Sequence, residues 1–375
     1  MSSDLNHDPE LLDALRLSLT RGLGPIAQTR LRNRFGTAVE IFQASREQLM
    51  SVEGIGPKLA TAIERQRNSP QVFEELQSCE QLNVSIMRLD DDDYPDGLRE
   101  IPDPPQLLYV RGSITERDRL SIGIVGSRRC TLYGRQQAER IARDLATAGI
   151  TVISGLARGI DACAHRGAME ANGRTIAVLG TGVGHIYPPE HGPLSEEVIA
   201  HGAVISEACL RQAPVPGLFP QRNRIISGLS QGVLIVEAAR NSGALHTARH
   251  ALEQGREVFV VPGRLDSAAS EGCHDLIRDG AQLVRHVDDI LETLGPLTQP
   301  TISAEGKTIL TPRELNLNEQ ERELLDLIPL EPGTVDEVLR SSDIDDARVL
   351  STLTVLEMKR LIRRLPGGYV VRDPH

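Results

Sequence analysis

The sequence predicts an α/β protein with a parallel sheet at its centre and a smaller domain on each side. Three observations support this fold class. Residues 106–295 alternate short apolar runs with helical patterns, residues 1–90 show helical patterns broken by glycine turns, and residues 313–375 show three helical patterns followed by a strand. A segment rich in proline and threonine at 296–312 is expected to be a linker.

Composition limits the class of protein. The 375 residues carry a formal net charge of −11, with 40% hydrophobic and 25% charged residues, which is typical of a globular protein of two or three domains. The absence of a long apolar run or an apolar leader predicts a cytoplasmic protein with no membrane segment. The five cysteines are scattered and form no CxxC pair, so we expect reduced thiols, no metal site and no cofactor.

Charge is distributed unevenly along the chain. Residues 1–104 hold 18 acidic and 11 basic residues, residues 105–295 hold 20 of each, and residues 296–375 hold 14 acidic and 10 basic residues. Nucleic-acid-binding domains are usually more basic than this. A nucleic-acid site in this protein would therefore need a local cluster of arginines.

The middle segment gives the strongest evidence for a parallel sheet. Its apolar runs are short and glycine-bounded, with helical patterns between them, as in βαβ units whose strands are buried on both faces. Right-handed crossovers would bring the carboxyl ends of all the strands to one edge, where open sheets bind ligands. The expected strands are 121–125, 151–154, 175–179, 203–206, 232–236 and 257–261.

Glycines, small hydroxyl residues and arginines converge at this carboxyl edge. Glycine allows a ligand to approach the backbone, helix N-termini carry partial positive charge, and arginine binds phosphate through two N–H groups. The edge is therefore predicted to bind an anion, most plausibly a phosphate. The candidate residues there are Gly126, Ser127, Arg128, Ser154, Gly155, Arg222, Asn223, Arg224, Ser242, Gly243 and Thr247.

Phe219, Arg222 and Arg224 each allow two interpretations. Phe219 could stack on a nucleic-acid base or could anchor the core. Arg222 and Arg224 could contact a ligand or could be solvated charges on a helix surface. Their position at the ligand edge favours a contact site.

No catalytic residues are predicted. The run Gly180–Gly184 does not match GxGxxG, and the sequence has no phosphate-binding P-loop, no Gly-x-Ser-x-Gly and no HExxH. Asp161 and His165, four residues apart, are interpreted as a pair that orients a loop. Glu237 is well placed for chemistry, but a role in holding the arginines is the preferred interpretation.

A series of short motifs occurs in order along the middle segment: GIVGSR at 123–128, YG at 133–134, SGLARGID at 154–161, GTG at 180–182, YP at 187–188, SE at 206–207, FPQRNR at 219–224, EA at 237–238, SG at 242–243 and VPG at 261–263. These motifs resemble those of the DNA-processing protein A family (DprA, also called Smf). The resemblance implies an extended Rossmann domain that binds single-stranded DNA, forms a homodimer and loads the RecA recombinase during natural transformation. It implies that Gly126, Ser127, Arg128, Phe219, Arg222, Asn223 and Arg224 lie in the single-strand pocket. One departure is that Pro216 and Gln221 are not basic, so phosphate binding would be weaker or would use Arg211.

The flanking segments fit the same family. Residues 49–60 resemble a helix-hairpin-helix within a sterile-alpha-motif-like (SAM-like) domain, which makes Gly54, Gly56 and Lys58 candidate contacts to duplex DNA. The alternative is a packing domain that does not touch DNA, because its net charge is negative. Residues 313–375 resemble a winged helix, with its third helix expected to end in a basic cluster at 359–364.

Two other functions remain as alternatives. One is a nucleotide phosphoribohydrolase of the lysine-decarboxylase-like (LOG) group, which has a related sheet, but its PGGxGTxxE motif is absent from residues 237–247. The other is an interaction scaffold, which would leave the arginines of the carboxyl edge unexplained.

Overall fold

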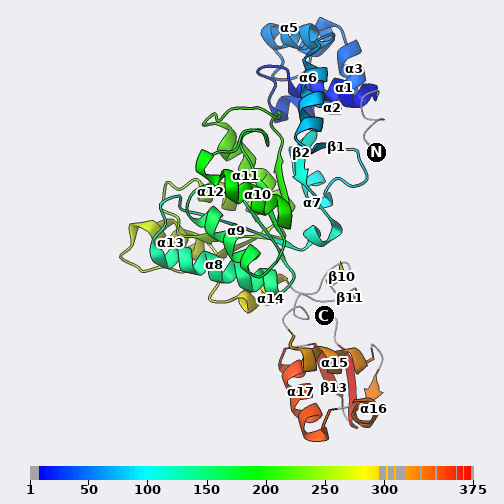
Figure 1. The fold of residues 1–375 in the computed structure, drawn as a ribbon, viewed down its shortest axis with the longest axis vertical. Coiled ribbons are helices and arrows are strands. Elements are labelled where there is room, and N and C mark those ends of the chain that lie inside the picture. Colours follow the sequence, from blue (N-terminus) through cyan, green and yellow to red (C-terminus); the bar gives the residue numbers. More distant parts are fainter. Residues whose placement is uncertain are drawn as a thin grey trace. The chain divides into compact units, whose positions relative to one another are not determined.

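A computed structural model describes residues 8–294, 301–302, 308–309, 317–329, 332–342, 344–359, 361–365 and 367–372 (Figure 1). The described chain divides into two compact units, the first extending to Leu283 and the second beginning at Val284. Each unit is described separately below.

The first unit begins with six helices, as the glycine-broken pattern predicted. Helices α3 and α4 each start at a capping box, in which Thr37 pairs with Glu40 and Ser45 with Gln48. Helices α2 and α5 instead start with a proline that follows a glycine. The helices are α1 (Pro9–Ser18), α2 (Pro25–Phe35), α3 (Ala38–Gln43), α4 (Arg46–Met50), α5 (Pro57–Gln66) and α6 (Gln71–Gln81).

A nine-stranded sheet follows, in the order β1-β2-β6-β5-β4-β3-β7-β8-β9. The strands from β3 to β9 pair in parallel, whereas β2 pairs antiparallel with both β1 and β6. The mixed α/β class and the Rossmann-like parallel core are confirmed. The strands are β1 (Val84–Arg88), β2 (Leu107–Gly112), β3 (Ser121–Gly126), β4 (Thr151–Ser154), β5 (Thr175–Val178), β6 (Gly202–Ser206), β7 (Gly232–Val236), β8 (Glu257–Val260) and β9 (Gln282–Leu283).

The direction of strand addition reverses between β3 and β7. From β3 the chain adds β4, β5 and β6 on one side, and then returns to add β7, β8 and β9 on the other. Such a switch point opens a crevice at the carboxyl ends of the two central strands. The switch point lies next to Gly126 and Glu237, at the edge where sheets of this kind bind ligands.

Helices pack against the sheet through buried apolar side chains. On one face, side chains of α9 and α10 pack with β5 and β6, and on the other, side chains of α11 and α12 pack with β3, β4 and β7. The helices of this unit are α7 (Asp96–Arg99), α8 (Leu132–Thr147), α9 (Ile160–Glu170), α10 (Gly192–His201), α11 (Leu218–Leu229), α12 (Ala244–Glu253) and α13 (Glu271–Arg278).

The boundary between the helical segment and the sheet differs from the expected one at residue 90. Strand β1 lies within the range 1–90 that was expected to be all helical, and it pairs with β2 at the edge of the sheet. The buried side chains of α1 to α6 also share one core with Tyr109, Val204 and Leu210. The helical segment is therefore packed onto the α/β core within a single compact unit.

The second unit contains α14 (Val287–Leu294) and the predicted winged helix. The three strands of the winged helix are ordered β12-β14-β13. Its buried apolar side chains come mainly from α15, α16, α17, β13 and β14, and they include Leu324, Val338, Leu353 and Val370. The elements are α15 (Glu319–Leu327), β12 (Gly333–Thr334), α16 (Val335–Ser341), α17 (Asp346–Met358), β13 (Ile362–Leu365) and β14 (Tyr369–Arg372).

The third helix of the winged helix and the expected linker before it differ from what the sequence predicted or lie partly outside the described residues. The third helix ends at Met358, and residues 362–365 form a strand, so the basic cluster is not a helix C-terminus as expected. The expected linker at 296–312 lies mostly outside the described residues, except for a short antiparallel pair of β10 (Thr301–Ile302) and β11 (Thr308–Ile309). Within the ranges described, no helix is both long and apolar enough to cross a membrane.

The core that helices α1 to α6 share with the sheet predicts how a substitution in α1 changes the free energy of unfolding. Leu15 of α1 is fully buried in it, so Leu15→Ala should lower the free energy of unfolding by about 2–5 kcal/mol. Because the core is shared, hydrogen exchange should accelerate in β2 and β6 as well as in the helices. Leu252→Ala, at an exposed leucine of α12, is the control and should change stability by less than about 0.5 kcal/mol. Faster exchange confined to α1 to α6 would contradict a shared core.

Candidate functional site

The carboxyl edge is built on a close approach between β3 and β7. A Cβ atom on Gly126 would lie 1.8 Å from the carbonyl oxygen of Val236, so no residue with a side chain fits there without moving a strand. One residue further on, the backbone N–H of Ser127 donates to the carbonyl oxygen of Glu237 at 2.8 Å. The chain therefore leaves β3 in a fixed direction, toward solvent.

Glu237 fastens the loop that follows β3. Its carboxylate accepts hydrogen bonds from the backbone N–H of Thr131, at 2.8 Å, and from the hydroxyl of Thr131. Gly134 leaves the room for this carboxylate, since a Cβ atom there would lie 2.3 Å from it. Glu237 therefore anchors this loop through Thr131, whereas the sequence interpretation had it holding the arginines.

Arg128, Phe219 and Tyr187 form a row on the surface of this edge. The guanidinium carbon of Arg128 lies 5.4 Å from the centroid of the Phe219 ring. The Phe219 ring in turn lies 5.6 Å from the Tyr187 ring, with an angle of 49° between the planes. Arg128 is exposed, whereas the two rings are half-buried. The row thus combines a cation with two partly accessible aromatic faces.

Two local features position the side chains of this row. Gly180, after β5, lies against Phe219, since a Cβ atom on it would come within 3.1 Å of the ring. Next to Arg128, the Ser127 hydroxyl accepts a hydrogen bond from the backbone N–H of Arg129 at 3.1 Å. The loops after β3 and β5 and the first turn of α11 therefore meet at one place.

Arg222 is inside the protein rather than on its surface. It is 4% exposed, and its guanidinium donates to the carbonyl oxygens of Gly155, at 2.8 Å, and Val178. Burial lowers the pKa of Arg222 to about 10, while the charge of Asp161 opposes that shift. Burial likewise raises the pKa of Asp161. Arg222 therefore ties together the ends of β4 and β5, and this conformation does not present it to a phosphate.

Arg224 points to a different part of the interior. Its guanidinium lies 2.5 Å from a carboxylate oxygen of Glu207 and 3.0 Å from one of Asp103. Residues two apart on a helix point in nearly opposite directions, so Arg222 and Arg224 cannot face one ligand together. Arg224 is therefore buried, whereas the sequence analysis had placed it on the surface of the carboxyl edge.

The other expected site residues also divide into surface and interior. Ser154 is buried and donates to the carbonyl oxygen of Ile124 at 2.6 Å, and Gly155 and Thr247 are also buried. Asn223 is half-exposed, and its side-chain amide donates to the carbonyl oxygen of Gly243 at 3.2 Å. The expected residues that remain at least partly accessible are Gly126, Ser127, Arg128, Phe219, Asn223, Ser242 and Gly243.

Two surface residues at this edge were absent from the expected site. Tyr187 extends the aromatic row, and Arg158 is exposed and paired with Glu190 at 2.5 Å. Both belong to motifs that were noticed in the sequence, YP and SGLARGID. Nothing in the local sequence, however, shows that the loop after β5 turns back toward Phe219.

His165 does not form the expected pair with Asp161. Its Nδ1 lies 2.7 Å from the hydroxyl of Thr175, which itself donates to the carbonyl oxygen of Val152. Nδ1 must therefore carry the proton, and Nε2 is buried without a hydrogen-bond partner. Asp161 instead accepts from the backbone N–H of Ala157 at 3.3 Å. No group of three or more side chains suited to a metal ion occurs in the described ranges.

The helix-hairpin-helix has the backbone shape that the sequence predicts. Gly54 has a φ of +88°, which favours glycine, and Gly56 precedes α5 without any side-chain cap. Gly54, Gly56 and Lys58 are all exposed. Arg30 of α2 holds the turn by donating to the carbonyl oxygen of Glu53 at 3.2 Å. The uncapped N–H groups of α5 are therefore accessible to an anion.

Comparison with known families finds three matches along the chain. The model of DNA recombination-mediator protein A matches residues 85–295, the model of the DprA winged helix domain matches residues 310–368, and the model of the helix-hairpin-helix motif matches residues 37–63. Protein Smf from Synechocystis sp. is 36% identical over 383 residues, which cover 94% of this chain and 96% of that protein.

Two solved structures are also similar. The X-ray structure of DNA processing protein A from Streptococcus pneumoniae matches with a TM-score of 0.66 and 32% identity, covering 76% of this chain and 96% of that one. A structure of DNA processing protein A from Helicobacter pylori, described as showing its single-stranded DNA binding mode, matches with a TM-score of 0.51 and 31% identity. It covers 57% of this chain and 96% of that one.

The two arginines of the carboxyl edge should differ in their effect on stability. Arg222→Ala leaves two buried carbonyl oxygens without their donor and removes a buried positive charge that offsets the charge of Asp161, so it should cost about 3–5 kcal/mol of unfolding free energy. Arg128→Ala removes an exposed side chain and should change stability by about 0.5 kcal/mol or less. Urea unfolding followed by circular dichroism measures both. Equal losses would contradict the division into an internal and a surface arginine.

His165 predicts a pH dependence of stability. Burial lowers its folded-state pKa to about 3, against 6.5 in an unfolded chain. Between these two pH values the unfolded state binds a proton that the folded state does not bind. The contribution of the buried, neutral His165 to the free energy of unfolding is therefore complete above pH 6.5 and is lost as the pH falls toward 3. The loss should be about 1.4 kcal/mol per pH unit. Urea unfolding at pH 7, 6 and 5 should show this slope as the difference between wild type and His165→Asn. The same pH dependence in both proteins would argue against a buried neutral histidine.

Proposed function

Because the chain belongs to the DNA recombination-mediator protein A family, we propose that its carboxyl edge binds single-stranded DNA. The single observation that carries the proposal is the surface row of Arg128, Phe219 and Tyr187. Stacking of bases on aromatic rings together with a nearby cation is the usual way to bind single strands without sequence preference. The structure of the relative from Helicobacter pylori, which is described as showing a single-stranded DNA binding mode, supports the same proposal.

Each residue of the edge has a separate part in this proposal. Arg128 neutralises a phosphate, and Phe219 and Tyr187 provide the faces on which bases stack. Gly126, Ser127, Ser242 and Gly243 allow the backbone to approach the strand, and Asn223 supplies a polar contact. Arg222, Ser154, Gly155 and Thr247 act from beneath by holding the loops in place.

Beyond strand binding, we infer a role as a recombination mediator. The chain would act as a homodimer that protects incoming DNA and loads the RecA recombinase during natural transformation. This role needs no chemical step, and the carboxylates nearest the edge are already engaged: Glu237 with Thr131, and Asp161 with the backbone of Ala157. We therefore propose that the protein is not an enzyme, and that Gly54, Gly56 and Lys58 add a contact to duplex DNA.

The surface row predicts distinct mutational effects on strand binding. Arg128→Ala should weaken binding to fluorescent oligo-dT by about 1.5–3 kcal/mol and reduce the salt dependence, because one phosphate contact is lost. Phe219→Ala and Tyr187→Ala should each weaken binding by about 1–3 kcal/mol with an unchanged salt dependence, because stacking releases no counterions. Fluorescence anisotropy at several salt concentrations measures both quantities.

Arg117→Ala serves as the matched control, because Arg117 is an exposed arginine that precedes β3 at the opposite edge of the sheet. It should leave oligo-dT affinity nearly unchanged. If all three edge variants bind as the wild type does, the proposed site is wrong. Hydrolysis of nucleoside monophosphates by the same samples would instead favour the phosphoribohydrolase alternative.

The mediator role can be tested separately. In a strand-exchange reaction in which RecA competes with a single-strand-binding protein, the wild type should shorten the lag, and Arg128→Ala should not. A protein that binds oligo-dT tightly but leaves the lag unchanged would contradict RecA loading while leaving the strand-binding site intact.

A further inference from the structure

Arg158 and Glu190 form an ion pair beside the surface row. Nε of Arg158 lies 2.5 Å from a carboxylate oxygen of Glu190, and the two side chains are 56% and 51% exposed. The contact with Glu190 raises the pKa of Arg158, and Tyr187 adds to that rise, so the pair lies next to Tyr187. The row therefore has a cation at each end: Arg128 over the Phe219 ring, and Arg158 beside Tyr187.

The loop that carries Arg158 packs directly on the loop that carries Arg128. A Cβ atom on Gly159 would lie 2.3 Å from the carbonyl oxygen of Ser127 and 2.9 Å from that of Arg128. The backbone N–H of Ile160 also donates to the carbonyl oxygen of Ser127 at 3.2 Å. Both arginines are therefore held on adjoining loops of the carboxyl edge.

The loop that carries Glu190 is fixed to the Arg158 loop as well. Nδ1 of His191, a buried side chain, donates to the carbonyl oxygen of Leu156 at 2.8 Å. Leu156 is fully buried and has a φ of +56°, a backbone conformation that residues other than glycine adopt only where their surroundings hold them. Two anchored loops thus bring Arg158 and Glu190 together.

An exposed ion pair of this kind is easily exchanged for another. Such pairs add little to stability, because water screens the charges and both side chains lose freedom. A phosphate can accept hydrogen bonds from two N–H groups of one guanidinium, so it competes well with a carboxylate. Arg158 therefore has the exposure and the chemistry of a phosphate contact, although a carboxylate occupies it.

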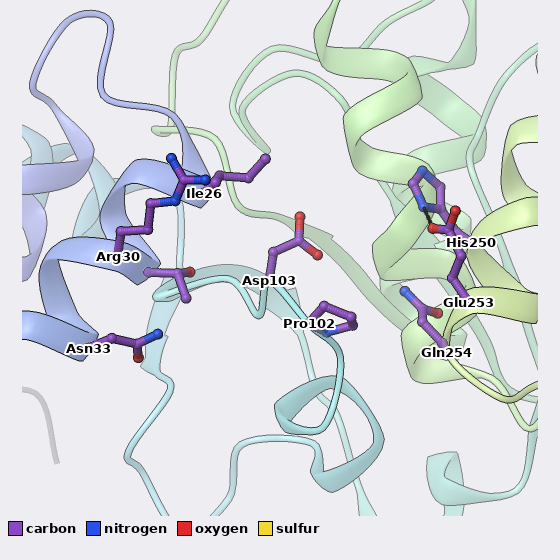
Figure 2. Close-up of a pocket in the computed structure, with 9 residues that line it drawn as sticks. Ile26, Arg30, Asn33, Pro102, Asp103, His250, Glu253 and Gln254 are labelled. Carbon is purple, nitrogen blue, oxygen red and sulfur yellow. Dashed lines mark ion pairs between the residues drawn. The ribbon is translucent and has the colours of Figure 1, made fainter. Parts of the chain in front are cut away.

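The ion pairs around the recess between α2 and α12 do not share this position (Figure 2). Asp103 there pairs with the buried Arg224 at 3.0 Å, and His250 lies 3.5 Å from a carboxylate oxygen of Glu253. None of the described residues that line this recess is a phenylalanine or a tyrosine. A single strand would find no such ring to stack on there, in contrast to the surroundings of Arg158.

We propose that Glu190 is a displaceable stand-in for a strand phosphate, and that Arg158 binds a phosphate once Glu190 has left. The inference rests on the strand-binding function proposed above and adds a second phosphate contact to the one at Arg128. Bases stacked on Phe219 and Tyr187 raise the local concentration of phosphate at Arg158, an advantage that a lone anion lacks. Glu190 therefore makes the edge selective for a strand over small anions.

The test measures binding of fluorescent oligo-dT to the full-length protein by anisotropy at low salt. Glu190→Gln keeps the size of the side chain and removes its charge. It should bind oligo-dT about tenfold more tightly, because Arg158 no longer has to exchange a carboxylate for a phosphate. Arg158→Ala should bind about tenfold more weakly than the wild type, because a charge-assisted phosphate contact is lost.

Glu170→Gln is the matched control for the loss of one negative charge. Glu170 is 55% exposed and lies 3.6 Å from Arg143, so it belongs to an ion pair of similar exposure. It lies at the end of α9 opposite to Arg158, away from the surface row. Because exposed charges at that separation are screened, Glu170→Gln should change oligo-dT affinity by less than about twofold.

The double variant that combines Glu190→Gln with Arg158→Ala decides whether the two residues act together. The gain from Glu190→Gln should disappear when Arg158 is absent. The proposal is overturned if Glu190→Gln gains no more than Glu170→Gln, or if its gain persists in the double variant, since Glu190 would then act by general repulsion. In either case, weaker binding by Arg128→Ala would leave the strand-binding function standing. If neither the wild type nor any variant binds oligo-dT, the strand-binding function fails and this inference fails with it.

Discussion

The close approach of β3 to β7 at Gly126 is the constraint on which the carboxyl edge depends. The absence of a side chain there lets the two central strands pair to their ends, at the point where strand order reverses. The hydrogen bond from Ser127 to Glu237 then sets the exit direction of the chain, and Glu237 anchors the next loop through Thr131. The exposed Arg128 lies in the loop that these contacts anchor, with its guanidinium over the Phe219 ring.

In the proposed strand-binding site, the arginines of a chain with a net charge of −11 have different tasks. Arg222 and Arg224 lie in the interior, where backbone carbonyls and carboxylates surround them, and they shape the edge without adding accessible positive charge. Arg128 is on the surface and stacks on an aromatic ring, which orients the guanidinium without neutralising it. Affinity in this account depends on one oriented cation and two aromatic faces rather than on a broad basic surface.

Much of the fold was predictable, because buried parallel strands are continuous apolar runs that end at glycine. All six runs identified in residues 106–295 are strands, and the three helices expected in residues 313–375 are present as α15, α16 and α17. Strand β1 was missed because Val84–Arg88 mixes apolar and polar residues at the sheet edge and directly follows a helical pattern. The shared core was also not predictable, since periodicity shows that a helix has an apolar face but not which surface that face covers.

The site was predicted in outline but not in detail, for reasons that differ between residues. Arg222 and Arg224 were grouped because they are close in sequence, yet the helix that begins at Leu218 turns them apart, and Pro220 obscured that helix. Ser154 and Thr247 lie in the right segments but face inward. Tyr187 was not in the predicted site because its contact with Phe219 joins the loop after β5 to helix α11, 32 residues further along the chain, and no local sequence pattern indicates such a contact.

The most direct test of the strand-binding account is photochemical crosslinking of a single-stranded oligonucleotide that carries 5-iodouracil. A base stacked on an aromatic ring crosslinks to it efficiently on irradiation, and mass spectrometry of the digested protein identifies the peptide. The account predicts that crosslinks concentrate on the peptides containing Phe219 and Tyr187 and decrease in Arg128→Ala. Crosslinks confined to the helix-hairpin-helix around Gly54 or to the winged helix, with none at Phe219 or Tyr187, would contradict it.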